Sequence, residues 1–396
     1  MNNNSVKNQA EIQAGNCSEK IAMTGTPCQI MAASIMDDYS GHLGDLPIDL
    51  KIGLFCMENF SYSYLKELLK KHDIDLKDVN QCRIEKGYLW LYLTEDQVFK
   101  ISLDEAKTCI RKSCQICMDF TSEQSDLSVG SVGSPEGWST VIIRNEKGLE
   151  LMENAEEAKY IETKPISDSG IKLMERLALK KKSENLKEIK KRENMARPVL
   201  YWRIMPEGEY LEEIADSQFA DLKSDVIDVG ACVLCGACLL SCPENIVEIN
   251  GRKPEVKGKC PEGCNACYVA CPRTYVPDNM VSHDAEKSAF GDYIKIVSAK
   301  AAMFQGQDGG VVTSILSFAV SSKVVEEALI VDKSAHDPWK PKPGLTGDVE
   351  AIVKASGTKY SACPIFKPLK AEQNNSLKNN SFSESGSNKL KSNGGS

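Results

Sequence analysis

The chain has 396 residues, of which 42% are hydrophobic, so it has room for two or three globular domains. Its formal net charge of −8 gives no reason to expect a nucleic-acid partner, and no apolar run is long enough to be a transmembrane segment. The first residues lack the apolar core of a signal peptide. The 16 cysteines favour a reducing, cytoplasmic location, where thiols persist as metal ligands.

The two ends of the chain are low in sequence complexity. Residues 1–16 and 373–396 are rich in Asn and other small or polar residues. Such segments cannot bury enough apolar surface to offset the entropy that is lost on folding. Both ends are therefore predicted to be disordered tails.

Between these tails, apolar runs that indicate strands alternate with helical periodicities. The predicted strands are Ile48–Phe55, Val141–Arg144, Ile294–Ala299 and Ala328–Val331. The predicted helices are Ser61–His72, a long helix at 171–195 that Pro198 ends, and a helix that begins near Gly310. The basic run Lys180–Arg192 on the long helix is interleaved with glutamates, which indicates a solvated face rather than the alternative, a docking patch.

Outside residues 225–280 the cysteines are scattered, and four of them stand at positions suited to metal ligands. Cys28 follows a turn, Cys56 ends a predicted strand, and Cys114 and Cys117 are spaced so that both sulfurs can face one metal. From spacing alone, this pair is ambiguous between a redox dithiol, zinc and iron–sulfur. Cys109 is a weaker candidate, and the remaining cysteines are expected to be plain thiols: Cys17, Cys82 and Cys363.

Two glycine-rich segments are candidate phosphate loops. They read Gly130-Ser131-Val-Gly133-Ser134-Pro-Glu-Gly137-Trp138-Ser139-Thr140 and Gly306-Gln307-Asp308-Gly309-Gly310-Val-Val-Thr313. The second segment precedes a predicted helix, so its backbone amides and the helix N-terminus could approach a phosphate closely. The Gly130–Thr140 segment contains the flat aromatic side chain of Trp138. An ordinary turn is the alternative for either segment.

A central insert, residues 225–280, carries two iron–sulfur signatures. They read Cys232-Val-Leu-Cys235-Gly-Ala-Cys238-Leu-Leu-Ser-Cys242-Pro and Cys260-Pro-Glu-Gly-Cys264-Asn-Ala-Cys267-Tyr-Val-Ala-Cys271-Pro. Three closely spaced thiolates can hold three corners of a cubane, while the fourth cysteine of each run points to the other cluster. The runs therefore predict that Cys271 completes the first site and Cys242 the second. Disulfides and zinc are the alternatives, but a chain of this size needs no disulfide staples.

Taken together, these segments resemble the beta-subunit family of coenzyme F420 hydrogenases and dehydrogenases. The matching text includes Gly25-Thr-Pro-Cys-Gln29, Gly53-Leu-Phe-Cys-Met-Glu-Asn-Phe60, Gly130–Thr140, Gly306–Thr313 and Gly357-Thr-Lys359-Tyr360. It covers nearly everything between residues 17 and 372. The ferredoxin-type insert makes the chain most similar to the F-type subunits of F420H2 dehydrogenases.

The resemblance implies a bound FAD that accepts hydride from the reduced deazaflavin. It also implies a further [4Fe-4S] cluster on Cys28, Cys56, Cys114 and Cys117. Flavin or deazaflavin contacts are expected from the two glycine-rich segments and from Lys359. The implied fold is α+β: a mixed α/β flavin-binding domain, split and permuted in sequence, with an inserted two-cluster ferredoxin-type domain.

The order of the parts departs from the family. Residues 17–200 resemble the family's C-terminal half, residues 225–280 its ferredoxin module, and residues 285–372 its N-terminal half. Circular permutation is tolerated where the new ends are exposed, which predicts that the halves close on each other within one chain. Complementation between neighbouring chains is the alternative.

The expected function is oxidation of reduced coenzyme F420. A flavin exchanges hydride for single electrons, and the clusters carry those electrons onward to subunits of a membrane-bound dehydrogenase complex or to ferredoxin. The implied protein is cytoplasmic, or peripheral on the inner membrane face through a partner complex. The alternatives are a non-catalytic polyferredoxin-like carrier and a related F420-dependent reductase component with another acceptor.

Overall fold

The computed structural model describes residues 20–93, 97–250, 252–281, 289–304, 307–334 and 339–374. The predicted tails fall outside these ranges apart from residues 373 and 374, which continue a helical segment, 367–374. Cys17 and Gly306 also lie outside the described residues. Within the described ranges, no helix combines the length and apolar character needed to cross a bilayer.

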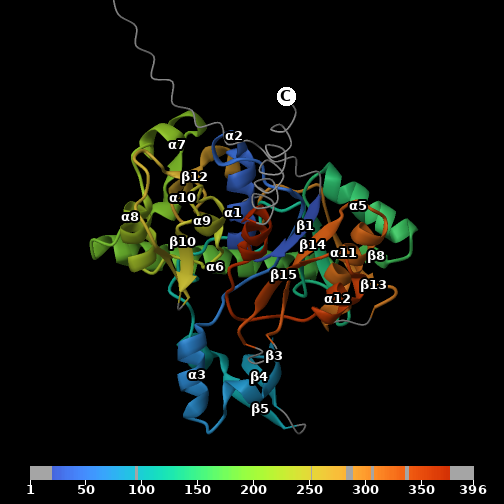
Figure 1. Ribbon diagram of the computed structural model, residues 1–396. Coiled ribbons are helices and arrows are strands. Elements are labelled where there is room, and N and C mark those ends of the chain that lie inside the picture. The colour runs from blue at the N-terminus through green and yellow to red at the C-terminus, as the bar shows by residue number, and fades with distance from the viewer. Residues whose placement is uncertain are drawn as a thin grey trace, which may run out of the picture.

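Eight strands form one mixed sheet, in the order β15-β14-β1-β2-β6-β7-β13-β8 (Figure 1). Their bounds are β1 Ile21–Gly25, β2 Ile48–Leu54, β6 Leu127–Gly130, β7 Ser139–Ile143, β8 Ile161–Pro165, β13 Lys295–Ala301, β14 Glu327–Asp332 and β15 Lys342–Thr346. The four neighbours β14, β1, β2 and β6 run parallel, and the other pairings are antiparallel. Each strand predicted from an apolar run is present, within about two residues of its predicted ends.

The sheet joins segments from both ends of the chain. Strand β13 lies between β7 and β8 and is antiparallel to each, with Val297 opposite both Val141 and Pro165. Strand β14 pairs in parallel with β1. The two halves that are separated in sequence by the cysteine-rich insert therefore complete one sheet within a single chain.

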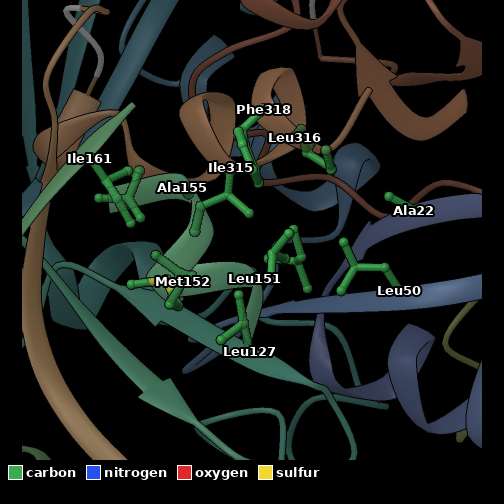
Figure 2. Packing of buried hydrophobic residues seen from close by; sticks show 14 of the residues in the cluster. Ala22, Leu50, Leu127, Leu151, Met152, Ala155, Ile161, Ile315, Leu316 and Phe318 are labelled. Carbon is green, nitrogen blue, oxygen red and sulfur yellow. The ribbon is translucent and has the colours of Figure 1, made fainter. Parts of the chain in front are cut away.

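Helices α5 (Glu146–Glu157), α11 (Val311–Ser321) and α12 (Val349–Lys354) cover one face of this sheet. Leu50 and Leu127 of the strands pack there against Leu151 of α5 and Ile315 of α11 (Figure 2). Helix α11 is buried along most of its length, and the small side chains of Ser314 and Ser317 are buried together with its apolar residues. It begins directly after Gly310, as the sequence predicts.

On the opposite face, α1 (Pro27–Asp38) packs with the cysteine-rich module. Ile30 of α1 and Ile21 of β1 share a buried cluster with Val233 and Leu240 of the module and with Phe366. The module, residues 225–280, holds the short elements α9 Ala237–Leu240, α10 Ala266–Val269, β10 Val247–Asn250, β11 Lys253–Val256 and β12 Val276–Pro277. The segment before it adds β9 Ile204–Met205, α7 Glu207–Glu213 and α8 Phe219–Leu222. Helix α2, Ser40–Leu43, follows α1 toward it.

A small lobe projects from the main sheet (Figure 1). It consists of the antiparallel strands β3 Val79–Glu85, β4 Tyr88–Leu93 and β5 Val98–Ser102 with the helices α3 Tyr62–Lys70 and α4 Leu103–Lys107. Leu65 and Leu69 of α3 pack on Leu89 and Leu91 of β4 in a separate core. The amphipathic pattern predicts α3 from the sequence, whereas the three strands are a finding of the structure.

The long helix α6 spans Asp168–Asn194, close to its predicted range. The expectation that its basic run is a solvated face is wrong in part, because Lys181 and Arg192 are buried at 3% and 8% exposure. Lys181 follows the buried residues Met174 and Ala178 at helical spacing, so it falls on the buried stripe of the helix. Its neighbours Lys180 and Lys190 are exposed.

Candidate functional site

The segments singled out in the sequence meet at one edge of the main sheet. Cys28 follows the carboxyl end of β1, Cys56 follows β2, and the Gly130–Thr140 loop follows β6. Strand β13 runs in the same direction as β6, since each is antiparallel to β7, and the segment Asp308–Gly310 follows its end. Ligands of open α/β sheets bind outside the carboxyl ends of the strands, so this edge is the candidate site.

Asp308, Gly309 and Gly310 form a turn of three consecutive left-handed residues, with φ of 52°, 91° and 66°. We call these three residues the glycine turn. Gly310 is the N-cap of α11, and within the described residues no side-chain hydrogen bond caps this end of the helix. Free amides at a helix N-terminus favour an anion. Ser314 on the same turn of α11 has a buried hydroxyl without a hydrogen-bond partner among the described residues.

The glycine turn lies against the other glycine-rich segment. A Cβ atom on Gly309 would lie 3.0 Å from the backbone nitrogen of Ser139, and the Ser139 hydroxyl donates to the Asp308 carbonyl. Lys164 and Lys300 place their ammonium nitrogens 3.7 and 5.0 Å from the centre of the Trp138 ring. Lys300 also pairs with Glu162 at 3.0 Å, so the cations lie beside Trp138, the residue that precedes Ser139.

The rest of the Gly130–Thr140 loop is occupied by contacts within the protein. A Cβ atom on Gly130 would lie 2.2 Å from the Phe55 ring, and one on Gly133 would lie 3.1 Å from the Gly170 carbonyl. The Ser134 hydroxyl hydrogen-bonds to Thr140 and to Ser298. Gly137 has open space beside it, and Ser131 is exposed. The loop's inner residues therefore hold its shape, and its later residues face the glycine turn.

A cavity of about 530 Å³ opens between the small lobe and the main sheet. Arg83 of β3, Lys333 after β14 and Lys359 line it, together with Tyr360. Burial lowers the pKa of Lys359 from 10.5 to about 8, and its ammonium donates to the carbonyls of Ala355 and Ser356 at the end of α12. The volume is ordinary for a small-molecule site.

This cationic cavity adjoins both the glycine turn and Cys56. Arg83 interacts electrostatically with Asp308, and Tyr360 interacts with Asp308 and with the Cys56 thiol. Burial, followed by the charges of Cys82, Asp308 and Cys56, raises the pKa of Tyr360. These interactions place the cavity near the glycine turn and Cys56, although neither of them lines it.

The structure brings Cys28, Cys56, Cys114 and Cys117 together from three separate loops. We call them the sheet-edge group. Burial, followed by Cys28 and Cys117, raises the pKa of Cys114 to about 11. Burial also raises the pKa of Cys56, on which Cys114, Cys28 and Cys117 all act. Burial would also raise the pKa of Cys117, but Lys181 and Arg273 keep it below its ordinary value. Cys109 takes no part in these interactions and lies in the core of the small lobe.

Side chains of helix α6 hydrogen-bond to the loops that carry the sheet-edge group. The Lys181 ammonium donates to the carbonyls of Cys56 and Asp119 at 2.5 and 2.7 Å. One turn later, the Asn185 amide donates to the carbonyls of Cys114 and Cys117. These side chains fix the loops that carry three of the four thiols.

The eight cysteines of the module fall into the two groups that their spacing predicts. Cys232, Cys235, Cys238 and Cys271 interact with one another, and so do Cys242, Cys260, Cys264 and Cys267. We call them the inner and the outer module group. Burial, followed by Cys260, raises the pKa of Cys267 to about 12. Cys260 and Cys264 of the outer group remain half-exposed, whereas Cys235 and Cys238 are buried.

Backbone amides point at several of these sulfurs. The amides of Leu234, Ala237, Ala266 and Arg273 each donate to the sulfur of the cysteine two residues earlier. Leu234 adopts a left-handed φ of 65°, which tightens the curl of the first run. Amides directed at four thiolates stabilise the negative charge of an iron–sulfur cluster, so the donor set fits one.

No three His, Cys, Asp or Glu side chains converge on a single-ion site in the described ranges. A cubane makes a different demand, because each thiolate binds a separate iron corner and the four sulfurs stay apart. The twelve grouped side chains are all thiols, the groups that such a cluster would need.

Sequence reasoning missed two cations of this site, Lys181 and Arg273. Arg273 follows the Cys271-Pro pair and is 2% exposed. Lys181 could have been noticed as a lysine within an otherwise apolar helical stripe. Neither residue belongs to a recognisable motif.

Two family models match the chain, and both describe the beta subunit of coenzyme F420 hydrogenase/dehydrogenase. The model of the C terminus of that subunit matches residues 18–169, and the model of its N terminus matches residues 296–370. Together they span more than half of the chain, in reversed order. The module lies between the two matches.

Curated relatives agree with this assignment. The beta subunit of coenzyme F420 hydrogenase from Methanococcus voltae is 40% identical over 186 residues, which are 46% of this chain and 66% of that protein. The coenzyme F420-dependent sulfite reductase of Methanocaldococcus jannaschii is 38% identical over 46% of this chain and 30% of its own length. The F-type subunit of the F(420)H(2) dehydrogenase from Methanosarcina mazei is 31% identical over 42% and 47%.

Among solved structures, a chain of the F420-reducing [NiFe] hydrogenase complex from Methanosarcina barkeri is 36% identical, with a TM-score of 0.42. That match covers 45% of this chain and 62% of the other. This chain thus spans just under two thirds of the length of the hydrogenase subunits it matches. The order of the two family matches shows that the C-terminal half comes first, and the chain belongs to the coenzyme F420 hydrogenase/dehydrogenase beta-subunit family.

Proposed function

We propose that the protein oxidises reduced coenzyme F420 by hydride transfer to FAD and passes single electrons through [4Fe-4S] clusters to a redox partner. The observation that carries this proposal is the meeting of the glycine turn, the cationic cavity and the sheet-edge group at one edge of the sheet. A flavin site beside a four-thiol group is the arrangement that two-electron to one-electron exchange requires.

The FAD pyrophosphate would bind at the glycine turn. The uncapped amides of α11 would offset its negative charge, and Lys164, over the ring of Trp138 next to Ser139, would add a positive charge on that side. The cationic cavity, with Arg83, Lys333 and Lys359, would hold the anionic deazaflavin beside it. When bound, FAD would supply the exchange between hydride and single electrons.

Three groups of thiols would hold three [4Fe-4S] clusters. The sheet-edge group adjoins the inner module group, because Cys28 interacts with Cys232 and Cys235. The inner group in turn adjoins the outer one, because Cys267 interacts with Cys238 and Cys271. The thiols thus form a continuous series from the sheet edge to the outer module group, whose half-exposed Cys260 and Cys264 would let a partner approach.

The partner would be ferredoxin or the subunits of a membrane-bound dehydrogenase complex, reached in the cytoplasm or at the inner membrane face. The alternative is a related F420-dependent reductase component that passes its electrons to another acceptor. The similarity to a coenzyme F420-dependent sulfite reductase supports this alternative. A polyferredoxin-like carrier without catalytic activity is less well supported, since a carrier needs neither the glycine turn nor the cavity.

The test is anaerobic purification of the full chain with flavin and iron analysis, followed by addition of reduced coenzyme F420. We expect one FAD and about twelve irons per chain, because three cubanes of four irons need the twelve grouped thiolates. Reduced coenzyme F420 should bleach the flavin absorbance. If the protein contains iron but no FAD, and the flavin absorbance does not bleach after FAD is added, the protein is instead a non-catalytic electron carrier.

A further inference from the structure

Two buried cations from different parts of the chain lie against the sheet-edge group. Lys181 of α6 is 3% exposed, and its charge interacts with Cys117, Cys56 and Cys114. A lysine is seldom buried to this degree without a charge partner. The Asp119 carboxylate also interacts with this charge, although it accepts from the amides of Ser122 and Glu123 and forms no salt bridge with Lys181 among the described residues.

Arg273 reaches the same group from the cysteine-rich module. Its guanidinium hydrogen-bonds to the Cys117 sulfur and lies 4.2 Å from the centre of the Tyr201 ring. It also interacts with Cys28 and, on its other side, with Cys232. Arginine stays charged under all ordinary conditions, so this cation is fixed between the sheet-edge group and the inner module group.

The cations become fewer from the sheet edge outward, and one carboxylate, Asp119, acts on Cys117 of the sheet-edge group. Arg111 is a third cation near the sheet-edge group, through Cys114, and it also acts on Cys232. The inner module group therefore has Arg111 and Arg273. The outer group, at half-exposed thiols, has Lys370 opposed by Glu244.

We propose that Lys181 and Arg273 are fixed counter-charges that give the sheet-edge cluster the highest reduction potential of the three. The inference rests on the proposed function, since it requires a cluster on these thiols. Reduction adds one electron and no atoms, so it increases the negative charge of a buried group. Buried cations favour that reduced state, because net charge and burial set the potential of iron–sulfur clusters. The sheet-edge cluster would then be the first to accept an electron from the reduced flavin, before the electron passes outward.

The experiment is a redox titration of the anaerobic holoprotein, followed by electron paramagnetic resonance. The sheet-edge signal is identified as the one that Cys114→Ser removes. Lys181→Met should lower its reduced-to-oxidised ratio at fixed potential at least tenfold, which is about 59 mV for one electron. Arg273→Gln should shift the same signal in the same direction. The outer module signal should not move in Lys181→Met.

Two matched variants separate charge from packing. Lys181→Arg keeps the charge, and Lys180→Met removes an exposed charge one residue away on α6; neither should shift the sheet-edge signal. Loss of four irons in Lys181→Met but not in Lys181→Arg would also support a counter-charge, whereas loss in both would overturn it. An unchanged midpoint in Lys181→Met overturns this inference alone. A wild-type protein without any Cys114-dependent signal overturns the proposed function and this inference with it.

Discussion

Lys359 gives the cationic cavity a charge that depends on pH in an accessible range. Burial holds its pKa at about 8 in the folded chain, compared with 10.5 for an ordinary lysine. Between these two values the unfolded chain binds more protons at this residue than the folded chain does. Burial of the charged lysine therefore lowers the free energy of unfolding at pH values below about 8. This loss of stability is relieved as the pH rises from about 8 to 10.5.

We predict that coenzyme F420 binds more weakly as the pH rises through about 8. The expected loss is about tenfold, the size of one charge-assisted hydrogen bond. Equilibrium titrations of the FAD-loaded protein at pH 7 and pH 9.5 measure it. Lys359→Arg should bind equally at both values, and Lys359→Gln should bind weakly at both. A wild-type affinity that does not change with pH would place the anionic ligand away from Lys359.

Two cysteine variants should have separable effects. Cys114→Ser removes a thiolate of the sheet-edge group, whereas Cys235→Ser removes one of the inner module group. Each should lower the iron content from about twelve to about eight, since a cubane needs four ligands. Only Cys114→Ser should slow reoxidation of the reduced flavin in single-turnover absorbance measurements. Unchanged iron in Cys114→Ser would show that the third cluster does not exist.

Local spacing could predict which thiols lie together, but it could not predict their cations. The CxxC runs of the module are short, so the backbone itself sets which sulfurs meet. Cys28 and Cys56 join Cys114 only through the order of the strands, and the resemblance to a family was needed to group them. Lys181 belongs to a lysine-rich helix, and only its place on the Met174 stripe distinguishes it from exposed neighbours.

At the scale of elements, the glycine turn and α11 form one unit. We predict that Gly309→Ala releases FAD while the iron stays bound, because the new Cβ would lie 3.0 Å from the Ser139 nitrogen at a φ of 91°. Flavin and iron analysis of the purified variant measures this. The control is Gly87→Ala, which has a similar φ of 80° and open space around it. FAD retained in Gly309→Ala would move the pyrophosphate site elsewhere.

Helix α11 is also a main support of the sheet. Ile315 is fully buried among Leu151, Leu127 and Ala155 (Figure 2). We predict that Ile315→Ala lowers the free energy of unfolding by about 2–5 kcal/mol, the usual cost of a cavity in a close-packed core. Denaturant unfolding of the apoprotein measures it. Leu173→Ala on the exposed side of α6 should cost less than about 0.5 kcal/mol.

Buried parallel strands could be predicted from the sequence because both of their faces are apolar. The strands of the small lobe could not, since their alternating pattern between Val79 and Ser102 is interrupted by charges on the open face. The order of the strands in the main sheet could not be predicted from local sequence patterns either. Strand β13 pairs with β7 and β8 across more than a hundred residues, and no local pattern specifies such a contact.

At the scale of the whole molecule, the permuted order is accommodated by the pairing of strands from both halves. Removal of β13 would leave β7 and β8 without their shared neighbour, and removal of β14 would separate β15 from β1. Neither half therefore has a complete sheet. The cysteine-rich module, which lies between the halves in sequence, packs on α1 and Phe366 and so contacts both of them.

This closure leads to a prediction about dilution. If β13 and β14 pair within their own chain, closing the sheet costs no association entropy, and activity per chain should not depend on concentration. If the halves instead complement neighbouring chains, dilution should open the sheet beside the glycine turn and release FAD. Specific activity with reduced coenzyme F420, measured over a thousandfold dilution with excess FAD, distinguishes the two cases, with sedimentation reporting the mass. A steep fall that added FAD cannot restore would reject the self-complementing monomer, because only separation of the halves removes the site itself.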